Sequence, residues 1–268
     1  MRFKIDHDLH IHTYLSSCSK DPEQNKEFIL SYAKKKGFGT VAITDHFWDK
    51  DAGEPWGFYC PQDYDHIREI LPLPKDPEVR FLFGCEGEIN KDMVLGISRD
   101  KLDSFDFIVI PTTHMHMKGF TISEEEFLVP EACARLWVER LEALLNMDLP
   151  FHKVGIAHLS CALLNKKSKD DYLYTLSLIK SEDMERLFKK AAELGVGIEI
   201  NLGDMEYSEG HEDRVLRMYK IAKACGCKFY LGSDAHHPSE FGNPEYHFGR
   251  AIDYLGLTEE DKIPLLRQ

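Results

Sequence analysis

Short hydrophobic runs alternate along this chain with longer segments whose hydrophobic residues recur at helical spacing. The runs predict strands at residues 3–8 leading into 9–12, and at 40–44, 80–84, 105–111, 153–157, 197–200 and 228–231. The spacing predicts helices at 21–37, 64–71, 123 to about 146 with Pro130 as an interruption, 181–194, 211–224 and 244–254, with a surface loop at 166–171. Roughly seven strand–helix alternations favour a mostly parallel sheet or barrel, in one domain that covers residues 1–268.

Capping signals indicate where these helices begin and end. Asp21-Pro22 offers an acidic N-cap followed by proline at the first helical position, and Gly37 offers a glycine stop. Ser123 and Glu126 fit a capping box. We therefore expect one helix to begin at Asp21 and another at Ser123.

Each of the predicted strands runs directly into a short segment with polar side chains, and most of these segments contain a residue that can bind a metal ion. These residues are His10-Ile11-His12, Thr44-Asp45-His46, Gly84-Cys85-Glu86, His114-Met115-His116, His158, Glu199-Ile200-Asn201 and Ser233-Asp234-Ala235-His236. Residues i and i+2 of a strand point to the same side, so His10 and His12 can bind one ion together, as can Asp234 and His236. In a barrel all of these groups gather at the C-terminal mouth. Imidazole and carboxylate ligands suit Zn, Mn or Fe, and a carboxylate such as Glu86 can bridge two ions.

Composition narrows the possible functions. The chain has 268 residues, of which 43% are hydrophobic and 29% charged, so a packed core is expected rather than disorder. Lys and Arg total 33 against 46 Asp and Glu, a formal charge of −13 that argues against nucleic acid as the main partner. A phosphate substrate remains compatible with this charge, because bound metal ions supply local positive charge.

The location of the protein is predicted from the absence of sequence signals. Hydrophobic runs are far shorter than the roughly 18 residues of a membrane span, and the first residues lack the apolar core of a secretory signal. Seven cysteines without a C-x-x-C pair argue against a disulfide framework. We therefore expect a cytoplasmic protein without membrane contact, whose oligomeric state the sequence leaves open.

Three further features have more than one interpretation. Cys18 follows His12 in a short polar segment, and it is either a soft ligand for zinc or an inert loop residue. The aromatic-rich segment 47–64 is either a lid or pocket wall, or ordinary core packing. His116 and His237 lie beside stronger ligand candidates and are either structural or contacts to ligands and substrate.

The ordered set of polar motifs resembles the PHP (polymerase and histidinol phosphatase) family. The resemblance rests on Asp8-Leu9-His10-Ile11-His12-Thr13, Ile43-Thr44-Asp45-His46, Gly84-Cys85-Glu86, His114, His158, Glu199-Ile200-Asn201 and Gly232-Ser233-Asp234-Ala235-His236. It implies a distorted (β/α)7 barrel, related to the TIM barrel, with two or three divalent metal ions at its mouth. Its length is also similar to that of stand-alone histidinol-phosphatase-type members.

The resemblance also implies roles for single residues. His10, His12, Glu86 and Asp234 match the ligands of one metal, and Glu86, His114 and His158 match those of a second. His46 and His236 match two ligands of a third, where the family often has a further histidine and this chain has Cys18. Glu199 and Asn201 match residues that support the ligands.

The implied reaction is hydrolysis of a phosphate ester by a metal-activated hydroxide. The catalytic residues would be Asp234, Glu86 and His236, and Asp234 or a neighbouring histidine would act as proton shuttle. Lys118 is the best candidate for a contact to the phosphate. The leading hypothesis is therefore a phosphomonoesterase for a small phosphorylated substrate, with L-histidinol phosphate, and thus histidine biosynthesis, as the first possibility. The alternatives are a phosphodiesterase or nuclease with the same metal centre, an amidohydrolase-type hydrolase, and a metal-binding barrel without catalysis.

Overall fold

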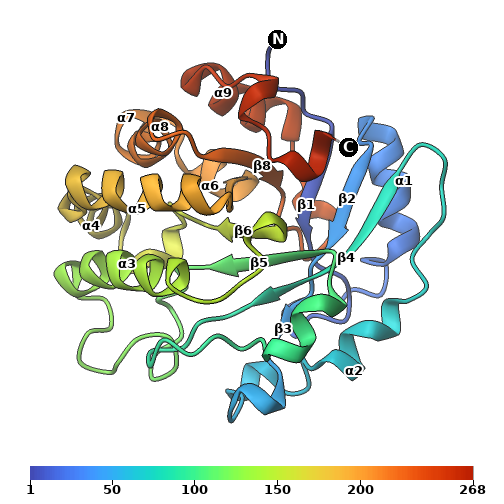
Figure 1. The fold of residues 1–268 in the computed structure, drawn as a ribbon, viewed down its shortest axis with the longest axis horizontal. Coiled ribbons are helices and arrows are strands. Elements are labelled where there is room, and N and C mark those ends of the chain that lie inside the picture. The colour runs from blue at the N-terminus through green and yellow to red at the C-terminus, as the bar shows by residue number, and fades with distance from the viewer. Residues whose placement is uncertain (268) are drawn as a thin grey trace.

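A parallel sheet that curves into an incomplete barrel forms the centre of the molecule in the computed structural model, which describes residues 1–267 (Figure 1). Its strands are β1 (His7–Ile11), β2 (Thr40–Ile43), β3 (His46–Phe47), β4 (Arg80–Gly87), β5 (Phe107–Pro111), β6 (Val154–Ala157), β7 (Gly197–Asn201) and β8 (Lys228–Gly232). The strands pair in the order β1-β2-β4-β5-β6-β7-β8, and the short β3 pairs with β4. Beyond β8 the chain returns to β1, where the Asp234 amide donates to the His10 carbonyl at 2.7 Å. The predicted distorted (β/α)7 barrel is therefore confirmed.

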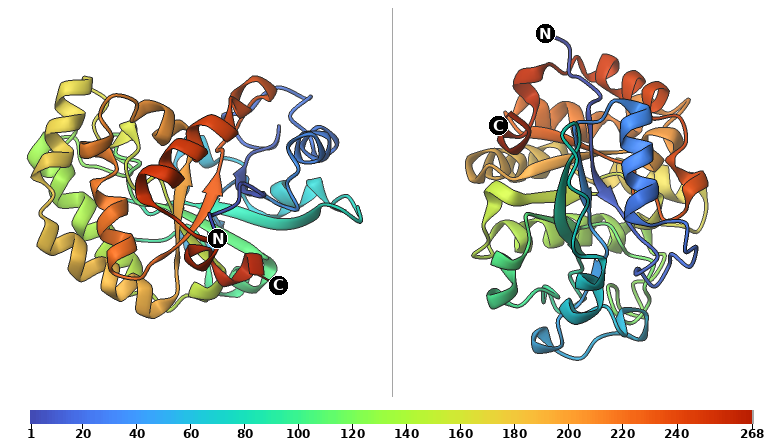
Figure 2. Two further views of the ribbon diagram at one scale, coloured as in Figure 1. Left: turned by 90° about the horizontal axis from the view of Figure 1, so that it is seen from above. Right: turned by 90° about the vertical axis from the view of Figure 1, so that its right-hand side faces the viewer.

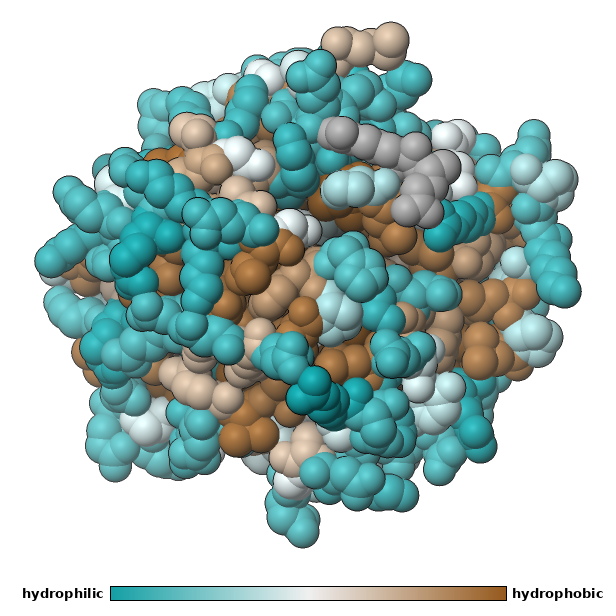
Figure 3. Space-filling view, viewed as in Figure 1, coloured by the Kyte–Doolittle hydropathy of each residue, from teal (hydrophilic) through white to brown (hydrophobic). Residues whose placement is uncertain are grey.

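Helices cover the outside of this sheet. They are α1 (Lys26–Lys36), α2 (Tyr64–Ile67), α3 (Pro130–Leu145), α4 (Lys169–Leu178), α5 (Ser181–Leu194), α6 (Leu202–Tyr207), α7 (Glu212–Val215), α8 (Arg217–Ala224) and α9 (Pro244–Leu255). The views in Figure 2 place α1 on the opposite side of the molecule from α3, α4 and α5. The face seen in Figure 1 carries mainly hydrophilic side chains, with hydrophobic ones visible between them (Figure 3). A search of the described helices finds none with the length and hydrophobicity needed to cross a membrane.

Helix α1 begins later than the capping signal predicted. Asp21 caps only a turn, because its side chain accepts a hydrogen bond from the Glu23 amide at 2.9 Å. The side chain of Gln24 then donates to the carbonyl oxygens beyond β1 and β8, which holds this segment against the ends of those strands. Asn25 is the true N-cap, and the predicted end at Gly37 is correct, since this residue has the left-handed φ of 70°.

One predicted helix start and one predicted loop were also wrong. Ser123 and Glu126 do form the predicted capping contacts, but Leu128 takes a φ of 62°, and helix α3 begins only at Pro130. Proline lacks an amide hydrogen and is therefore suited to the first helical position rather than to the interior. The predicted loop at 166–171 overlaps the start of α4, whose N-cap is Ser168.

The interior of the barrel is filled by side chains and does not form a pore. Leu9, Phe107 and Tyr230 belong to a buried cluster drawn from successive strands, while a much larger cluster lies between the sheet and the helices. Pairing of β1 with β2 is irregular between Asp8 and Ile11, and Ile11 packs into the larger cluster. Because the barrel is filled in this way, the polar residues at the strand ends meet above the packed interior.

Candidate metal centre

The structure brings the predicted ligand residues together at the carboxyl ends of the strands. His10 lies in β1 with His12 just beyond it, His46 lies in β3, and Glu86 lies in β4. The remaining candidates lie within a few residues of the ends of their strands, and they are His114 after β5, His158 after β6, and Asp234 and His236 after β8. Within the described chain these residues form overlapping groups. Inside each group, the ligand atoms lie within 4.8 Å of one another.

The first group contains His10, His12, Glu86 and Asp234. The Nε2 atoms of His10 and His12 are 3.2 Å apart, and they lie 3.3 Å and 3.0 Å from Asp234 Oδ1. Glu86 approaches the same two nitrogens at 3.6 Å and 3.4 Å. Ligands of a tetrahedral zinc ion with bonds near 2.0–2.1 Å stand about 3.3 Å from each other, so this spacing fits an ion at the centre of the group.

The second group contains Glu86, His114 and His158. His158 Nε2 lies 3.6 Å from Glu86 Oε1 and 3.5 Å from Asp234 Oδ2. Both oxygens of Glu86 and both ring nitrogens of His158 are buried without a hydrogen-bond partner in the described residues. A buried carboxylate is costly unless a cation or a donor compensates it, so the donor set fits a divalent cation shared by these side chains.

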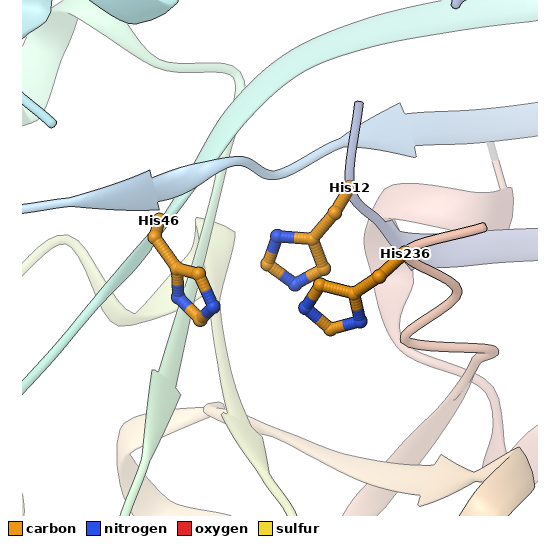
Figure 4. A group of neighbouring side chains, drawn as sticks. All are labelled: His12, His46 and His236. Carbon is orange, nitrogen blue, oxygen red and sulfur yellow. The ribbon is translucent and has the colours of Figure 1, made fainter. Parts of the chain in front are cut away.

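The third group contains His12, His46 and His236, whose imidazoles converge from three strand ends (Figure 4). The rings of His12 and His236 stack with centroids 4.0 Å apart and an angle of 10° between their planes. His46 Nδ1 is 2.7 Å from Glu86 Oε2, yet it does not meet the geometry of a hydrogen bond. This close approach places an imidazole nitrogen and a carboxylate oxygen where both can contact the same ion.

Cys18 lines the cavity beside the third group but does not belong to the clustered ligand atoms. Although burial raises the pKa of its thiol, hydrogen bonds with His236 and His46 lower it overall. A thiol whose pKa is lowered by neighbouring imidazoles is more readily converted into a thiolate, which is the form that binds metals.

Electrostatic shifts within the cluster are large. Burial alone would lower the pKa of His10, but the carboxylates of Glu199, Asp234 and Glu86 raise it to about 10. Burial would raise the pKa of Glu86, whereas His46 and His10 hold it well below its usual value. The carboxylates therefore create the negative potential that a divalent cation requires.

Glu199 orients the first histidine, in agreement with the supporting role implied by the resemblance. Its Oε1 contacts His10 Nδ1 at 2.7 Å, which leaves Nε2 of that ring directed at the first group. Its Oε2 accepts from the His158 amide at 3.0 Å and from Asn201 Nδ2 at 3.3 Å. In a metal-binding histidine, a hydrogen bond to the ring nitrogen that does not face the metal fixes the tautomer and the orientation of the ring.

The backbone is unusual next to two of the ligand candidates. His158 and Asp234 both have a φ of 57°, a left-handed conformation that non-glycine residues rarely adopt. Only glycine fits at position 232, because a Cβ there would lie 2.1 Å from Glu199 Oε1 and 2.6 Å from His10 Cβ. Strained residues persist where the surrounding structure holds them, and they are concentrated at functional sites.

Sequence reasoning missed a buried ion pair that supports the second group. Glu88 Oε2 contacts His114 Nδ1 at 2.8 Å, and Glu88 Oε1 accepts from Arg140 Nη2 at 2.8 Å. The side chains of Glu88 and Arg140 are both fully buried. Glu88 follows Glu86 at the i+2 position and so carried a usable signal, whereas Arg140 lies within α3 and no motif indicated it.

A cavity of about 340 Å³ opens beside these groups. Glu86, His114, Asp234 and His236 line one part of it, and residues of the aromatic segment 47–64 line another. Lys118 does not line this cavity, and its ammonium group lies 2.5 Å from a carboxylate oxygen of Glu124.

The chain was compared with protein-family models, with curated proteins and with solved structures. No protein-family model matches the chain. A "Probable phosphatase" of Shewanella oneidensis is 28% identical over 264 residues, which cover 97% of this chain and 86% of that protein. A "Probable phosphatase" of Caldicellulosiruptor bescii is 22% identical over 242 residues, which cover 90% of this chain and 84% of that protein.

One solved structure to which the chain is similar is histidinol phosphate phosphatase from Lactococcus lactis, complexed with zinc, L-histidinol and phosphate. It superposes with a TM-score of 0.61 at 16% identity and covers 96% of this chain and 98% of its own. A structure from Listeria monocytogenes has a TM-score of 0.60 at 15% identity and covers 91% of this chain and 100% of its own. At these identities the solved structures show a shared fold, and the names of the curated relatives agree with the prediction of a phosphatase.

Proposed function

We propose that this chain is a metal-dependent phosphomonoesterase of the histidinol-phosphatase type, built on a PHP-type barrel. The observation that carries the proposal is the position of Glu86, a buried carboxylate without hydrogen-bond partners in the described residues, at the junction of three histidine-containing groups. The fold shared with a histidinol phosphate phosphatase and the names of the curated relatives support the same reaction class.

The proposed ligands form three sets, for two or three ions of Zn, Mn or Fe. They are His10, His12, Glu86 and Asp234 for the first ion, Glu86, His114 and His158 for the second, and His46 and His236 with His12 or Cys18 for the third. Divalent ions in these sets would supply Lewis acidity and offset the negative charge of a phosphate ester.

The protein's own side chains divide the remaining work. Glu86, His10 and His12 are almost completely buried, so we assign them to holding and orienting the cluster. The side chains of Asp234 and His236 are 25% and 22% exposed and line the cavity. They are therefore the members of the cluster most accessible to a substrate, and we assign to them the exchange of a proton with the leaving alcohol.

The test combines metal analysis with phosphate release. Protein purified without chelator is analysed for metal per chain and is assayed with L-histidinol phosphate. We expect two or three equivalents of metal per chain, together with release of phosphate. Glu86→Gln should lose metal and activity together, whereas Glu139→Gln, a change at an exposed ion pair on α3, should lose neither. Absence of bound metal even after reloading would overturn the proposal.

Two parallel assays separate the alternatives. Cleavage of an end-labelled oligonucleotide in preference to phosphomonoesters would favour a nuclease. Release of ammonia or an amine without phosphate would favour an amidohydrolase-type reaction. Metal without turnover on any of these substrates would favour a metal-binding barrel that lacks catalysis.

We further propose that residues 1–268 form one domain. The support is the hydrogen bonding between the segments that follow β1 and β8, which lie near opposite ends of the chain. A single cooperative unfolding transition by circular dichroism and by tryptophan fluorescence is expected, and two separated transitions would contradict it.

A further inference from the structure

One wall of the cavity beside the metal centre consists of aromatic and aliphatic side chains. These side chains are Trp56, Phe58 and Tyr59 from the segment between β3 and α2, Met117 after β5, and Leu163 after β6. Phe58 meets the ring of His46 edge-on, with centroids 5.1 Å apart. The apolar wall therefore directly adjoins a ligand candidate, so a molecule whose phosphate reaches the cluster would place its organic half against this wall.

The mouth of the wall is partly open to solvent. Trp56 stacks on Phe120 with centroids 5.7 Å apart and 8° between the planes, yet 40% of Trp56 remains exposed. Phe58 is also only half-buried. Large exposed apolar groups that border a polar site are typical of ligand-binding surfaces.

Most of the ionisable side chains on the cavity lining belong to the ligand groups, and His116, Cys18 and Tyr59 are those that do not. Glu86 and Asp234 are the carboxylates on this lining, and both belong to ligand groups. Neither lysine nor arginine occurs among the lining residues of the described chain. The described lining thus offers no spare carboxylate to pair with an ammonium group, and neither lysine nor arginine to pair with a second anionic group.

We propose that the substrate is a phosphomonoester whose organic half is an uncharged aromatic or apolar group. This inference rests on the proposed phosphatase function and narrows its substrate class. Moving an ammonium group or a second phosphate against this wall would cost desolvation. For the ammonium group, attraction to the faces of the aromatic rings offsets only a small part of that cost at a partly exposed site, and the rings offer a phosphate nothing. An aromatic ring instead gains apolar burial and stacking on Trp56 and Phe58. L-Histidinol, which is cationic, is therefore a poor match for this cavity, although it binds in the Lactococcus structure.

The test compares esters that share a leaving-group chemistry. Phenethyl phosphate, tryptophol phosphate, L-histidinol phosphate and methyl phosphate are all esters of primary alcohols, so differences in kcat/KM report mainly on recognition of the organic half. We expect kcat/KM for the two aromatic esters to exceed that for L-histidinol phosphate at least about tenfold. Equal or better hydrolysis of L-histidinol phosphate would overturn the inference and leave the phosphatase function intact.

Variants of the wall locate the effect. Trp56→Ala should lower the ratio of kcat/KM for phenethyl phosphate to that for methyl phosphate about tenfold, and Trp56→Phe should restore most of it. Tyr246→Ala removes a tyrosine that is 48% exposed on α9 and does not line the cavity, so it should leave the ratio unchanged. An unchanged ratio in Trp56→Ala would contradict the proposed subsite.

A binding measurement distinguishes failure of this inference from failure of the phosphatase function. Saturation-transfer NMR with the free alcohols should show phenethyl alcohol and tryptophol bound, with weaker signals in Trp56→Ala, and L-histidinol unbound. If no ester releases phosphate, the proposed function fails, and the alcohol binding alone then supports or overturns the apolar subsite.

Discussion

Replacing Glu88 by glutamine should weaken both the fold and one ion site, because a single carboxylate serves Arg140 and His114 at once. Its Oε1 accepts from Arg140 Nη2 at 2.8 Å and from the Ile89 amide at 2.9 Å, and its Oε2 contacts His114 Nδ1 at 2.8 Å. An amide has one acceptor oxygen in place of two. The glutamine can therefore accept a hydrogen bond from Arg140 or from His114, but not from both.

The consequence for His114 follows from its tautomer. If the amide oxygen faces Arg140, the amide nitrogen faces His114 Nδ1, which must then accept a hydrogen bond. The ring proton moves to Nε2, the nitrogen that the wild-type arrangement leaves for an ion. Loss of a supporting partner of this kind typically lowers metal affinity about 10- to 100-fold.

The consequence for stability follows from burial. Arg140 is fully buried, and removing the charge of its partner leaves the guanidinium without compensation. Breaking a buried pair in this way costs roughly 3–5 kcal/mol, and we expect about 3 kcal/mol because the amide oxygen preserves one hydrogen bond. Urea unfolding of the metal-free protein measures this loss, and competition with a chromophoric chelator measures metal affinity.

The matched control is Glu139→Gln in the same helix as Arg140. Glu139 pairs with Arg135 at 2.5 Å, but both side chains are more than 40% exposed, at 43% and 47%. Exposed pairs contribute about 0.2–1 kcal/mol, so this variant should differ little from wild type. If Glu88→Gln matched the control in both unfolding free energy and metal affinity, the reasoning would be refuted.

Three further outcomes are expected. Gly232→Ala should lower the metal content per chain, because the new Cβ would lie 2.1 Å from Glu199 Oε1, and full metal occupancy would contradict the close packing. Cys18→Ser should abolish a thiolate-to-metal absorption band in the cobalt-substituted protein if the thiolate is a ligand, and an identical spectrum would exclude it. Burial alone would raise the pKa of Asp6, but hydrogen bonds from His7 and Lys262 lower it from 3.8 to about 2. Its stabilising contribution should therefore be present above pH 3.8 and be lost as the pH falls toward 2, and Asp6→Asn should flatten acid unfolding in that window.

The strand ends illustrate how much of the candidate site could be predicted from the sequence. Glu86, His158 and Asp234 each lie at or just beyond a hydrophobic run of strand length, and parallel strands bring their carboxyl ends to one edge. The hydrophobic run and the polar residue at its end are local features of the sequence, so they can be recognised without knowledge of the fold. The same is true of the end of α1 at Gly37.

Other features depended on residues that are distant along the chain. Helix α1 begins at Lys26 because Gln24 is held by carbonyl oxygens beyond both β1 and β8, a contact invisible to a capping motif. Arg140 reaches Glu88 across 52 positions, and its sequence neighbourhood is that of an ordinary amphipathic helix.

The sequence by itself determined the alternation of strands and helices, and with it the edge of the sheet where the polar residues would lie. The tertiary structure decided which ligand atoms share a group, that Glu88 supports His114, and that the wall beside them is apolar and free of spare charge. The physical reason is range. Periodicity and chain direction act between neighbours along the chain, whereas ligand spacing, hydrogen-bond partners and the composition of a cavity wall arise only when separate strands and loops pack together.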